Sequence, residues 1–234
     1  MKKLSLLAAV ILVSLGLRAQ INDPNAEVRE AKGFHGIQVS SAFNVYLTQS
    51  NEEAVAVSAA KTKDREMISV EVKDGILYIG LNKDWKWNSG NKKLRAYISF
   101  RQIDQLHISG ACDVFISGTL KADLLKVVQS GASDLHGRMD VGKLQVELSG
   151  ASDMNITGTA IRLYVAASGA SDFKGFELTT ETCEAKASGA SDIRVTVNKE
   201  LSAEATGASD VKYRGDCTIR EMKSSGAGSV TKGK

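Results

Sequence analysis

The pentapeptide Ser-Gly-Ala-Ser-Asp occupies residues 130–134 and recurs at residues 149–153, 168–172 and 188–192. Three variants complete the series, Ser-Gly-Ala-Cys-Asp at 109–113, Thr-Gly-Ala-Ser-Asp at 206–210 and Ser-Gly-Ala-Gly-Ser at 225–229. Successive copies begin 21, 19, 19, 20, 18 and 19 residues apart. A nearly fixed period of about this length is typical of one supersecondary unit that stacks on itself. The phrase therefore predicts a solenoid.

The segments between the phrases predict strands. Apolar and polar residues alternate ahead of each phrase, as in Leu144-x-Val146-x-Leu148. A period of two is typical of a strand with one buried face. Strands about 19 residues apart and in the same phase are expected to be parallel, in-register neighbours in successive coils. The predicted fold class is all-β, a parallel β-helix or β-solenoid. An apolar residue follows each Asp of the phrase: Val114, Leu135, Met154, Phe173, Ile193 and Val211.

Within the phrase, the glycine predicts a corner. A bend with positive φ, or a close approach between coils, selects glycine at every level. The alanine that follows is expected to place its methyl group inside the corner. The flanking Ser and Asp are expected to hydrogen-bond nearby backbone amides. The glycines assigned to these structural corners are Gly110, Gly131, Gly150, Gly169, Gly189 and Gly207, with Gly226 in the last variant.

The aspartates of the phrase form a column that allows two interpretations. Stacked coils place them about 4.8 Å apart along one edge, and Ca²⁺ binds carboxylate oxygens. Against a calcium ladder, the glycine-rich nonapeptide of calcium-binding β-rolls is absent, and the last three full copies carry a cation two residues beyond the Asp. We therefore expect a solvated, turn-capping edge and no metal site. The aspartates are Asp113, Asp134, Asp153, Asp172, Asp192 and Asp210, and the cations are Lys174, Arg194 and Lys212.

Residues 33–105 lack the phrase and predict a less regular N-terminal β-region. Alternating strands flank Asp74-Gly75, which is a strong signal for a hairpin. The stretch Ser40-Ser41-Ala42-Phe43-Asn44 resembles a degenerate copy of the phrase. We expect this region to continue into the repeat β-helix of residues 106–234, which has a period of about 19. Its hairpins would protect the first coil from edge-to-edge association.

Both tryptophans of the chain, Trp85 and Trp87, lie in the polar segment 82–93 around Lys86. One interpretation is a binding tip for glycans, lipid headgroups or a protein partner. The other is an alternating strand whose rings cover an end of the solenoid, because Trp is usually at least partly buried. The candidate binding residues are therefore Trp85, Lys86 and Trp87.

The first residues indicate export. Lys2 and Lys3 precede an apolar run from Leu4 to Leu17, and Ala19 ends a pattern typical of a signal peptide. We assign residues 1–19 to the signal peptide and residues 20–32 to a linker. The run is shorter than the roughly 20 apolar residues that a membrane span needs, so we expect no transmembrane segment in the mature chain. The net charge of +3 falls near zero without the signal, which does not favour nucleic-acid binding.

The three cysteines do not predict a disulfide framework. Cys183 occupies an apolar core column, Cys112 replaces a Ser of the phrase, and Cys217 lies in a turn-like stretch. A Cys183–Cys217 bridge would have to join stacked coils at different positions around the solenoid, so we do not expect it.

The Phe-x-x-Ile-x-Val stretch at 34–39, the Asp-Gly hairpin and the repeated phrase together resemble the auto-transporter adhesin "head GIN domain" family of exported bacterial proteins. The resemblance covers residue 33 to the C-terminus. It implies a right-handed parallel β-helix built in two parts and a role in adhesion at the cell surface. It implies no catalytic residues.

Three classes of function remain open from the sequence. The first is an exported adhesion or ligand-binding protein without catalysis or cofactor, located at the cell surface, in the periplasm or outside the cell, whose partner would be a polysaccharide or a cell-surface protein. The second is a structural component of the envelope or of an assembly. The third is a polysaccharide-active enzyme, which needs convergent carboxylates, whereas the aspartates here form one uniform column and the three histidines are scattered.

Overall fold

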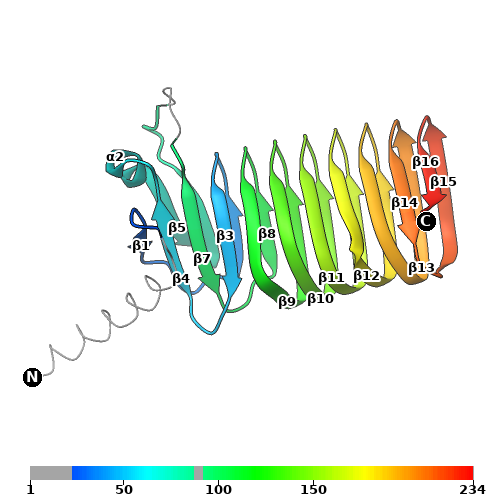
Figure 1. The fold of residues 1–234 in the computed structure, drawn as a ribbon, viewed down its shortest axis with the longest axis horizontal. Coiled ribbons are helices and arrows are strands. Elements are labelled where there is room, and N and C mark those ends of the chain that lie inside the picture. Colours follow the sequence, from blue (N-terminus) through cyan, green and yellow to red (C-terminus); the bar gives the residue numbers. More distant parts are fainter. Residues whose placement is uncertain (1–22, 87–91, 234) are drawn as a thin grey trace, which may run out of the picture.

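The computed structural model describes residues 23–86 and 92–233. Within them the chain forms a 16-stranded sheet, wound into a β-solenoid of about seven turns, and one short helix, α2 (Thr62–Glu66). Figure 1 shows the coils stacked side by side from the N-terminal region to the C-terminal end. The predicted all-β solenoid is confirmed.

The repeated phrase separates five long strands that run parallel and in register. Each strand begins at the Asp of a phrase and wraps around the solenoid to the next phrase. The register joins the aspartates of successive coils, so that Asp113, Asp134 and Asp153 are direct neighbours. The strands are β9 (Asp113–Gln129), β10 (Asp134–Leu148), β11 (Asp153–Ala167), β12 (Asp172–Ala187) and β13 (Asp192–Gly207).

The core fills the interior of the coils. The residues one position beyond each Asp, from Val114 to Val211, are all fully buried. Near the end of β9 the core column contains a polar residue, Gln129, which aligns with Leu148 of β10. Its amide nitrogen donates hydrogen bonds to the carbonyl oxygens of Ser133 and Asp153, whereas its buried Oε1 has no hydrogen-bond partner among the described residues.

The glycines of the phrase lie at a corner where successive backbones touch. From Gly110 to Gly226 they have φ between 70° and 85°. At Gly150 an added Cβ would lie 2.5 Å from the carbonyl oxygen of Gly131 in the preceding coil. The N–H of Ala151 donates to that same oxygen at 2.7 Å. The corner is therefore closed by backbone hydrogen bonds between coils and has no room for a side chain.

The prediction that the alanine points inward is wrong, because the alanines of the phrase are exposed. The second Ser lies inside instead, as with Ser152, which is fully buried and donates from Oγ to the carbonyl oxygen of Ser149 at 2.9 Å. The reason is the period of two, which resumes at this Ser and places it on the same face as the apolar residue two positions later. Cys112 takes the same buried place in the first phrase.

The N-terminal region continues the solenoid with two coils whose order in space differs from their order in sequence. Strand β2 (Gly36–Val39) lies between β6 (Ile76–Leu81) and β8 (Gln105–Ile108), all parallel. Strand β3 (Asn44–Gln49) lies between β7 (Arg95–Phe100) and β9, also parallel. The degenerate phrase is stacked on the first full phrase, since the Ala111 N–H donates to the Ser41 carbonyl oxygen at 2.6 Å. Ser41 has φ of 90° in the place of the glycine.

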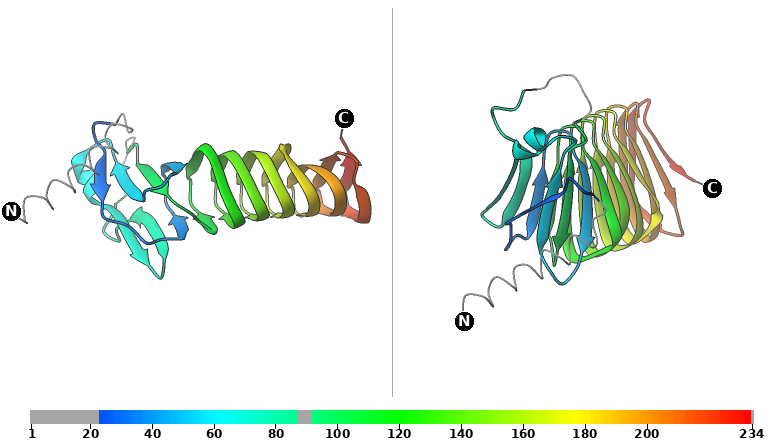
Figure 2. Two further views of the ribbon diagram at one scale, coloured as in Figure 1. Left: turned by 90° about the horizontal axis from the view of Figure 1, so that it is seen from below. Right: turned by 60° about the vertical axis from the view of Figure 1, so that its left-hand side comes forward.

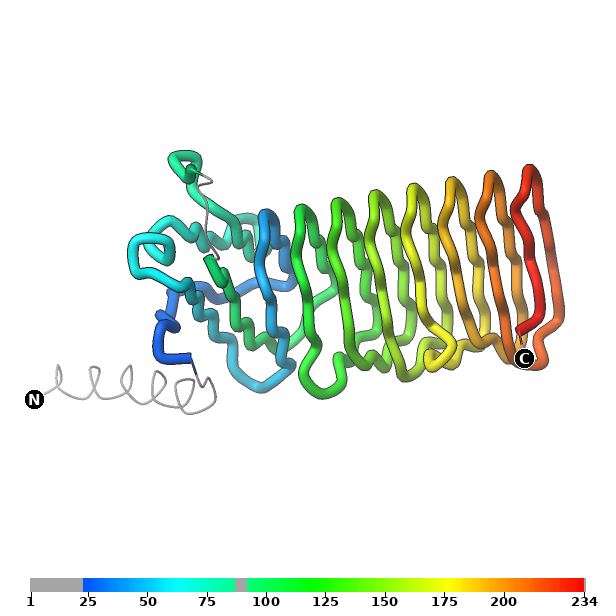
Figure 3. The backbone as a smooth tube through the Cα atoms, turned by 45° about the horizontal axis from the view of Figure 1, so that its top comes forward, coloured from blue at the N-terminus to red at the C-terminus, as the bar shows by residue number. Residues whose placement is uncertain are grey.

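The two ends of the solenoid differ. At the N-terminal end β4 (Ala54–Ser58) pairs antiparallel with β7, β1 (Glu27–Arg29) pairs antiparallel with β4, and β5 (Ile68–Lys73) forms the expected Asp74-Gly75 hairpin with β6. At the other end β14 (Asp210–Arg214), β15 (Thr218–Gly226) and β16 (Ser229–Lys232) complete the last coils. Figures 2 and 3 show α2 and these antiparallel strands at one end and plain coils at the other.

Candidate binding surfaces

The tryptophan segment leaves the solenoid between β6 and β7. Trp85 is half-buried and packs against the hydrophobic core, and its backbone N–H donates to the carbonyl oxygen of Asn82 at 2.9 Å. Lys86 is exposed. Trp87 lies outside the described residues. The structure therefore places two of the three candidate binding residues, a ring that rests partly on the scaffold and an exposed cation next to it.

Lys92, near the end of this segment, contacts the N-terminal end of the solenoid. Its Nζ lies 5.6 Å from the centroid of the Trp85 ring and 3.6 Å from Oδ1 of Asp64 in α2. Its carbonyl oxygen accepts a hydrogen bond of 2.8 Å from the N–H of Ala60. A cation over an indole face stabilises the ring in place. One side of Trp85 is thus held by the N-terminal end of the solenoid.

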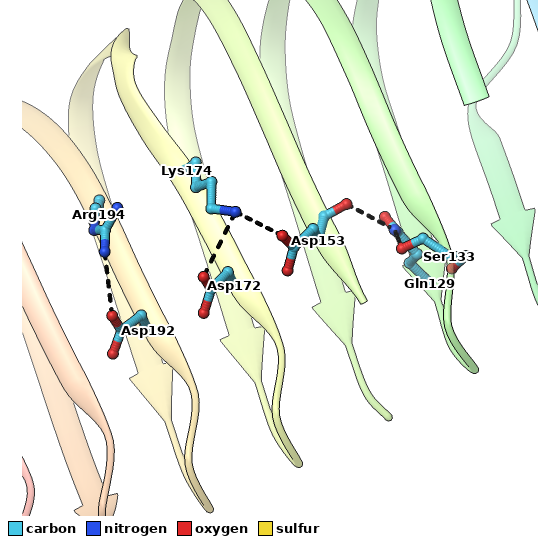
Figure 4. Close-up of polar contacts among 7 residues, drawn as sticks. All are labelled: Gln129, Ser133, Asp153, Asp172, Lys174, Asp192 and Arg194. Carbon is cyan, nitrogen blue, oxygen red and sulfur yellow. Dashed lines mark hydrogen bonds and ion pairs between the residues drawn. The ribbon is translucent and has the colours of Figure 1, made fainter. Parts of the chain in front are cut away.

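In the later coils the aspartates of the column contact cations of the chain itself, as Asp153, Asp172 and Asp192 do in Figure 4. Lys174 Nζ lies 2.6 Å from Oδ2 of Asp153 and 3.6 Å from Oδ2 of Asp172, and the first of these contacts is the main reason that its pKa is raised. Arg194 lies 3.3 Å from Asp192 and Lys212 lies 3.7 Å from Asp210, each within its own coil. Within the described ranges no three His, Cys, Asp or Glu side chains come together as metal ligands. From Asp153 to Asp210 the column is a row of partly exposed ion pairs.

An aromatic column lies beside it, and sequence reasoning missed it. The rings of Tyr97, Tyr46, Phe115 and His136, on β7, β3, β9 and β10, are stacked with centroids 5.2, 5.5 and 5.7 Å apart. Their interplanar angles are 13°, 22° and 17°, so the faces cover one another. The signal was present, because Phe115 and His136 each stand two residues beyond an Asp. Such pairs add about 0.5–1.5 kcal/mol each to stability.

At its N-terminal end this column is anchored by Asp23. The Oδ2 atom of Asp23 accepts hydrogen bonds of 2.9 Å from Arg95 Nη1 and from the Tyr97 hydroxyl, and only 5% of the Asp23 side chain is exposed. Burial acts to raise the pKa of Asp23, but its hydrogen bonds, led by the one with Ser58, outweigh it and lower the pKa. Burial and the hydrogen bond to Asp23 raise the pKa of Tyr97 to about 12.

Asp23→Asn is expected to lower the free energy of unfolding at pH 7 by about 1–3 kcal/mol, because the half-buried Arg95 and Tyr97 lose a charged acceptor. The pKa of Asp23 is lower in the folded state, so its contribution is present above about pH 4 and is lost as the pH falls through the folded pKa. Urea unfolding of both proteins at pH 7 and pH 3 should show the difference shrinking at pH 3. Asp216→Asn is the control, since that exposed carboxylate pairs only with Lys232. A difference for Asp23→Asn that is equal at both pH values would contradict the assignment.

β9, β10 and β11 bend around the lower corner of the solenoid (Figure 3). A groove of about 810 Å³ is lined by residues of these three strands. Two exposed aliphatic side chains line it, Leu124 (46% exposed) and Ile161 (55%). Gly142 of β10 lies between the two strands that carry them, at the level of Asp123 and Ile161, and an added Cβ there would be 2.6 Å from the Asp123 carbonyl oxygen. The two aliphatic residues interrupt the alternation of apolar and polar residues, and this irregularity was the sequence signal for the groove.

The groove exists because the chain leaves β3 at its last residue and does not turn around the lower corner. At this corner the side-chain amide of Gln49 makes backbone hydrogen bonds of the kind that a continuing strand would have made. Its Oε1 accepts a hydrogen bond of 2.7 Å from the Lys121 N–H, and its Nε2 donates to the carbonyl oxygens of Lys121 and Arg101 at 3.0 and 2.9 Å. The side-chain amide of Gln49 thereby pairs with both the N–H and the carbonyl oxygen of Lys121, and it forms one end of the groove.

Hydrogen-bonding groups lie beside the aliphatic side chains. Asp104, Asp123 and Asp140 contribute carboxylates to the lining. His35 Nδ1 lies 3.0 Å from Oδ1 of Asp104, and Thr159 Oγ1 donates to Oδ1 of Asp140 at 3.2 Å. This arrangement can accept hydrogen bonds from hydroxyl groups while the aliphatic side chains contact apolar carbon atoms.

The cysteines do not contribute to these surfaces. All three are free thiols; Cys112 and Cys183 are buried and Cys217 is half-buried. Burial raises the pKa of the Cys183 thiol, which lies in the core column as expected.

Several solved structures share this fold. A "putative adhesin" from Bacteroides fragilis is 24% identical, with a TM-score of 0.82 over 88% of this chain and 95% of that chain. A "putative lipid binding protein" from Parabacteroides distasonis is 20% identical, with a TM-score of 0.68 over 91% and 98%. A "putative adhesin" from Parabacteroides merdae is 16% identical, with a TM-score of 0.67 over 89% and 95%. At these identities the likeness establishes the fold.

No curated protein matches the chain. The part of the chain that the structure describes contains no helix of the length and apolar character needed to cross a bilayer. The sequence profile of the family described as "Putative auto-transporter adhesin, head GIN domain" matches residues 33–217, which include most of the solenoid and its N-terminal coils. The chain therefore belongs to the auto-transporter adhesin head GIN domain family.

Proposed function

We propose that the protein is exported and acts at the cell surface as an adhesion or ligand-binding β-helix without catalysis. Membership of an adhesin family and the likeness to adhesins of known structure support a surface binding role. The solenoid supports it as well, since stacked coils form a long rigid scaffold that presents repeated faces and a few irregular segments to a partner. Residues 1–19 act as the export signal in this proposal.

The groove at the lower corner is the observation that carries the proposal, and a polysaccharide is the ligand it fits. The groove spans several coils, so it accommodates an extended chain. The carboxylates of Asp104, Asp123 and Asp140 accept hydrogen bonds from sugar hydroxyls, and Leu124 and Ile161 contact the apolar faces of the sugar rings. The segment with Trp85, Lys86 and Trp87 provides a second contact, because tryptophan rings stack on sugars.

Ile161→Asp is expected to weaken polysaccharide binding roughly tenfold, because it replaces an apolar contact with a charge that must lose water on binding. Glycan-array binding and calorimetry of the mature protein would measure this. Asn155→Asp is the matched control, since it adds the same charge at an exposed position of the same strand, β11, outside the groove lining. Trp85→Ala/Trp87→Ala tests the second contact separately and should also weaken binding.

Equal binding by the wild type and the Ile161→Asp protein would overturn the assignment of the groove. Binding to a surface protein and to no glycan would overturn the polysaccharide ligand. Cleavage of any polysaccharide by the purified protein would overturn the absence of catalysis and favour the enzyme alternative. A structural role in the envelope is the second alternative, and the open coil at the C-terminal end is the feature that favours it.

A further inference from the structure

The last coil of the solenoid exposes the edge of a long strand. β15 pairs with β13 on one side. No described strand pairs with its other edge. All nine residues of β15 are exposed. An unpaired edge presents a row of backbone donors and acceptors on which another strand can add.

The core is also open at this coil. Ile219 aligns with Leu201 and Met222 aligns with Ala203, both of which are buried in β13. Ile219 and Met222 continue the same inward columns, but they are 37% and 43% exposed. In the coils before them the inward residues are covered by the next coil. The N-terminal end, by contrast, is closed by antiparallel strands and by α2.

The charges along this edge are arranged so that the strand complements itself. Met222 is the middle residue of β15, with Glu221 on one side and Lys223 on the other. In an antiparallel pair of two β15 strands centred on Met222, each Glu221 stands opposite the Lys223 of the second strand. Opposite charges on facing residues stabilise such a pair, whereas like charges destabilise it. Within one chain Lys223 Nζ already lies 2.6 Å from Oε1 of Glu221, so the four groups would form one network.

We propose that a second copy of this chain covers the terminal coil, with the two β15 strands paired antiparallel about a twofold axis at Met222. This axis runs along the sheet normal, so inward residues of both copies stay inward and the cores meet end to end. Met222 packs against its own equivalent, and Ile219 of each copy is covered. The same patch serves both partners, so the assembly closes as a dimer. The capped N-terminal ends then face outward, which leaves the groove and the Trp85 segment of each copy free for ligand.

Charge exchange tests the proposal in the full mature chain. Sedimentation and light scattering over a range of concentrations should find a dimer for the wild type. Glu221→Lys and Lys223→Glu each place like charges opposite one another twice and should weaken the dimer roughly tenfold or more. The double variant Glu221→Lys/Lys223→Glu restores opposite charges and should restore the dimer. Glu71→Lys is the control, because it makes the same change of charge at an exposed position of β5, at the opposite end of the solenoid.

A cysteine at the axis provides a second measurement. In a Cys217→Ser background, Met222→Cys should form a disulfide between two chains under mild oxidation, because residues on the axis face each other. Lys73→Cys, at the opposite end of the solenoid, should not. A wild type that stays monomeric at all concentrations overturns the proposal. So does a double variant that fails to dimerise while its circular dichroism and melting temperature match those of the wild type.

Discussion

Gly150→Ala is expected to lower the free energy of unfolding by about 3–4 kcal/mol. A left-handed backbone costs an alanine about 1–2 kcal/mol, and Gly150 has φ of 80°. The new methyl group would also meet the carbonyl oxygen of Gly131 at 2.5 Å. Gly131 is itself held against Gly110 in the same way, so the backbone cannot move aside without disturbing the column. Urea unfolding followed by circular dichroism measures the loss.

Gly118→Ala is the matched control. Gly118 also has a positive φ, 78°, but an added Cβ would meet nothing within 4 Å. Only the cost of the left-handed backbone applies, so the expected loss is about 1–2 kcal/mol. Equal losses in the two variants would mean that the close approach between coils contributes nothing, contrary to the packing of the corner.

Phe173→Ala is expected to lower the free energy of unfolding by about 3–5 kcal/mol, because it removes a fully buried ring and leaves a cavity. Phe173 lies in the core of β12, and Gly175 leaves space for its ring: a Cβ there would meet Cε1 of Phe173. The neighbouring coils are tied to their own neighbours, so the cavity cannot collapse completely. Thermal and urea unfolding both report this change.

Phe115→Ala is the comparison. Phe115 is two residues beyond the Asp of its phrase and lies on the outer face, whereas Phe173 is one residue beyond its Asp and lies on the inner face. The Phe115 ring is half-buried on the outer face and contacts Tyr46 and His136. Losing two stacked pairs is expected to lower the free energy of unfolding by about 1–3 kcal/mol. A loss as large as that of Phe173→Ala would contradict the alternation of inner and outer faces.

The repeated phrase predicted the coils, their parallel order and the inward column from Val114 to Val211, because each depends on local alternation and a constant period. The same alternation, applied to the phrase, would have placed Ser152 inside and Ala151 outside. The prediction that the alanine points inward was wrong because it was based on the small size of the side chain and not on this alternation. A buried Ser is satisfied here by the carbonyl oxygen of Ser149, three residues earlier, so its polarity does not exclude it from the interior.

The candidate surfaces were less predictable, because they join residues far apart in the sequence. Gln49 meets the Lys121 backbone 72 residues away, and Asp23 binds Tyr97 across 74 residues. No period links these positions. Nor does any local pattern indicate that β2 and β3 insert between strands that come much later in the chain.

The amino-acid sequence alone determined the solenoid, because a strand that repeats every 19 residues with the same phase has one way to bury its apolar face at every level. Tertiary structure alone decided where the regularity ends. The chain leaves the coil after Gln49, which opens the groove, and the antiparallel strands close one end of the core while Ile219 and Met222 stay exposed at the other. These features depend on hydrogen bonds between backbone groups that are far apart in the sequence. A repeat specifies such hydrogen bonds only between neighbouring copies.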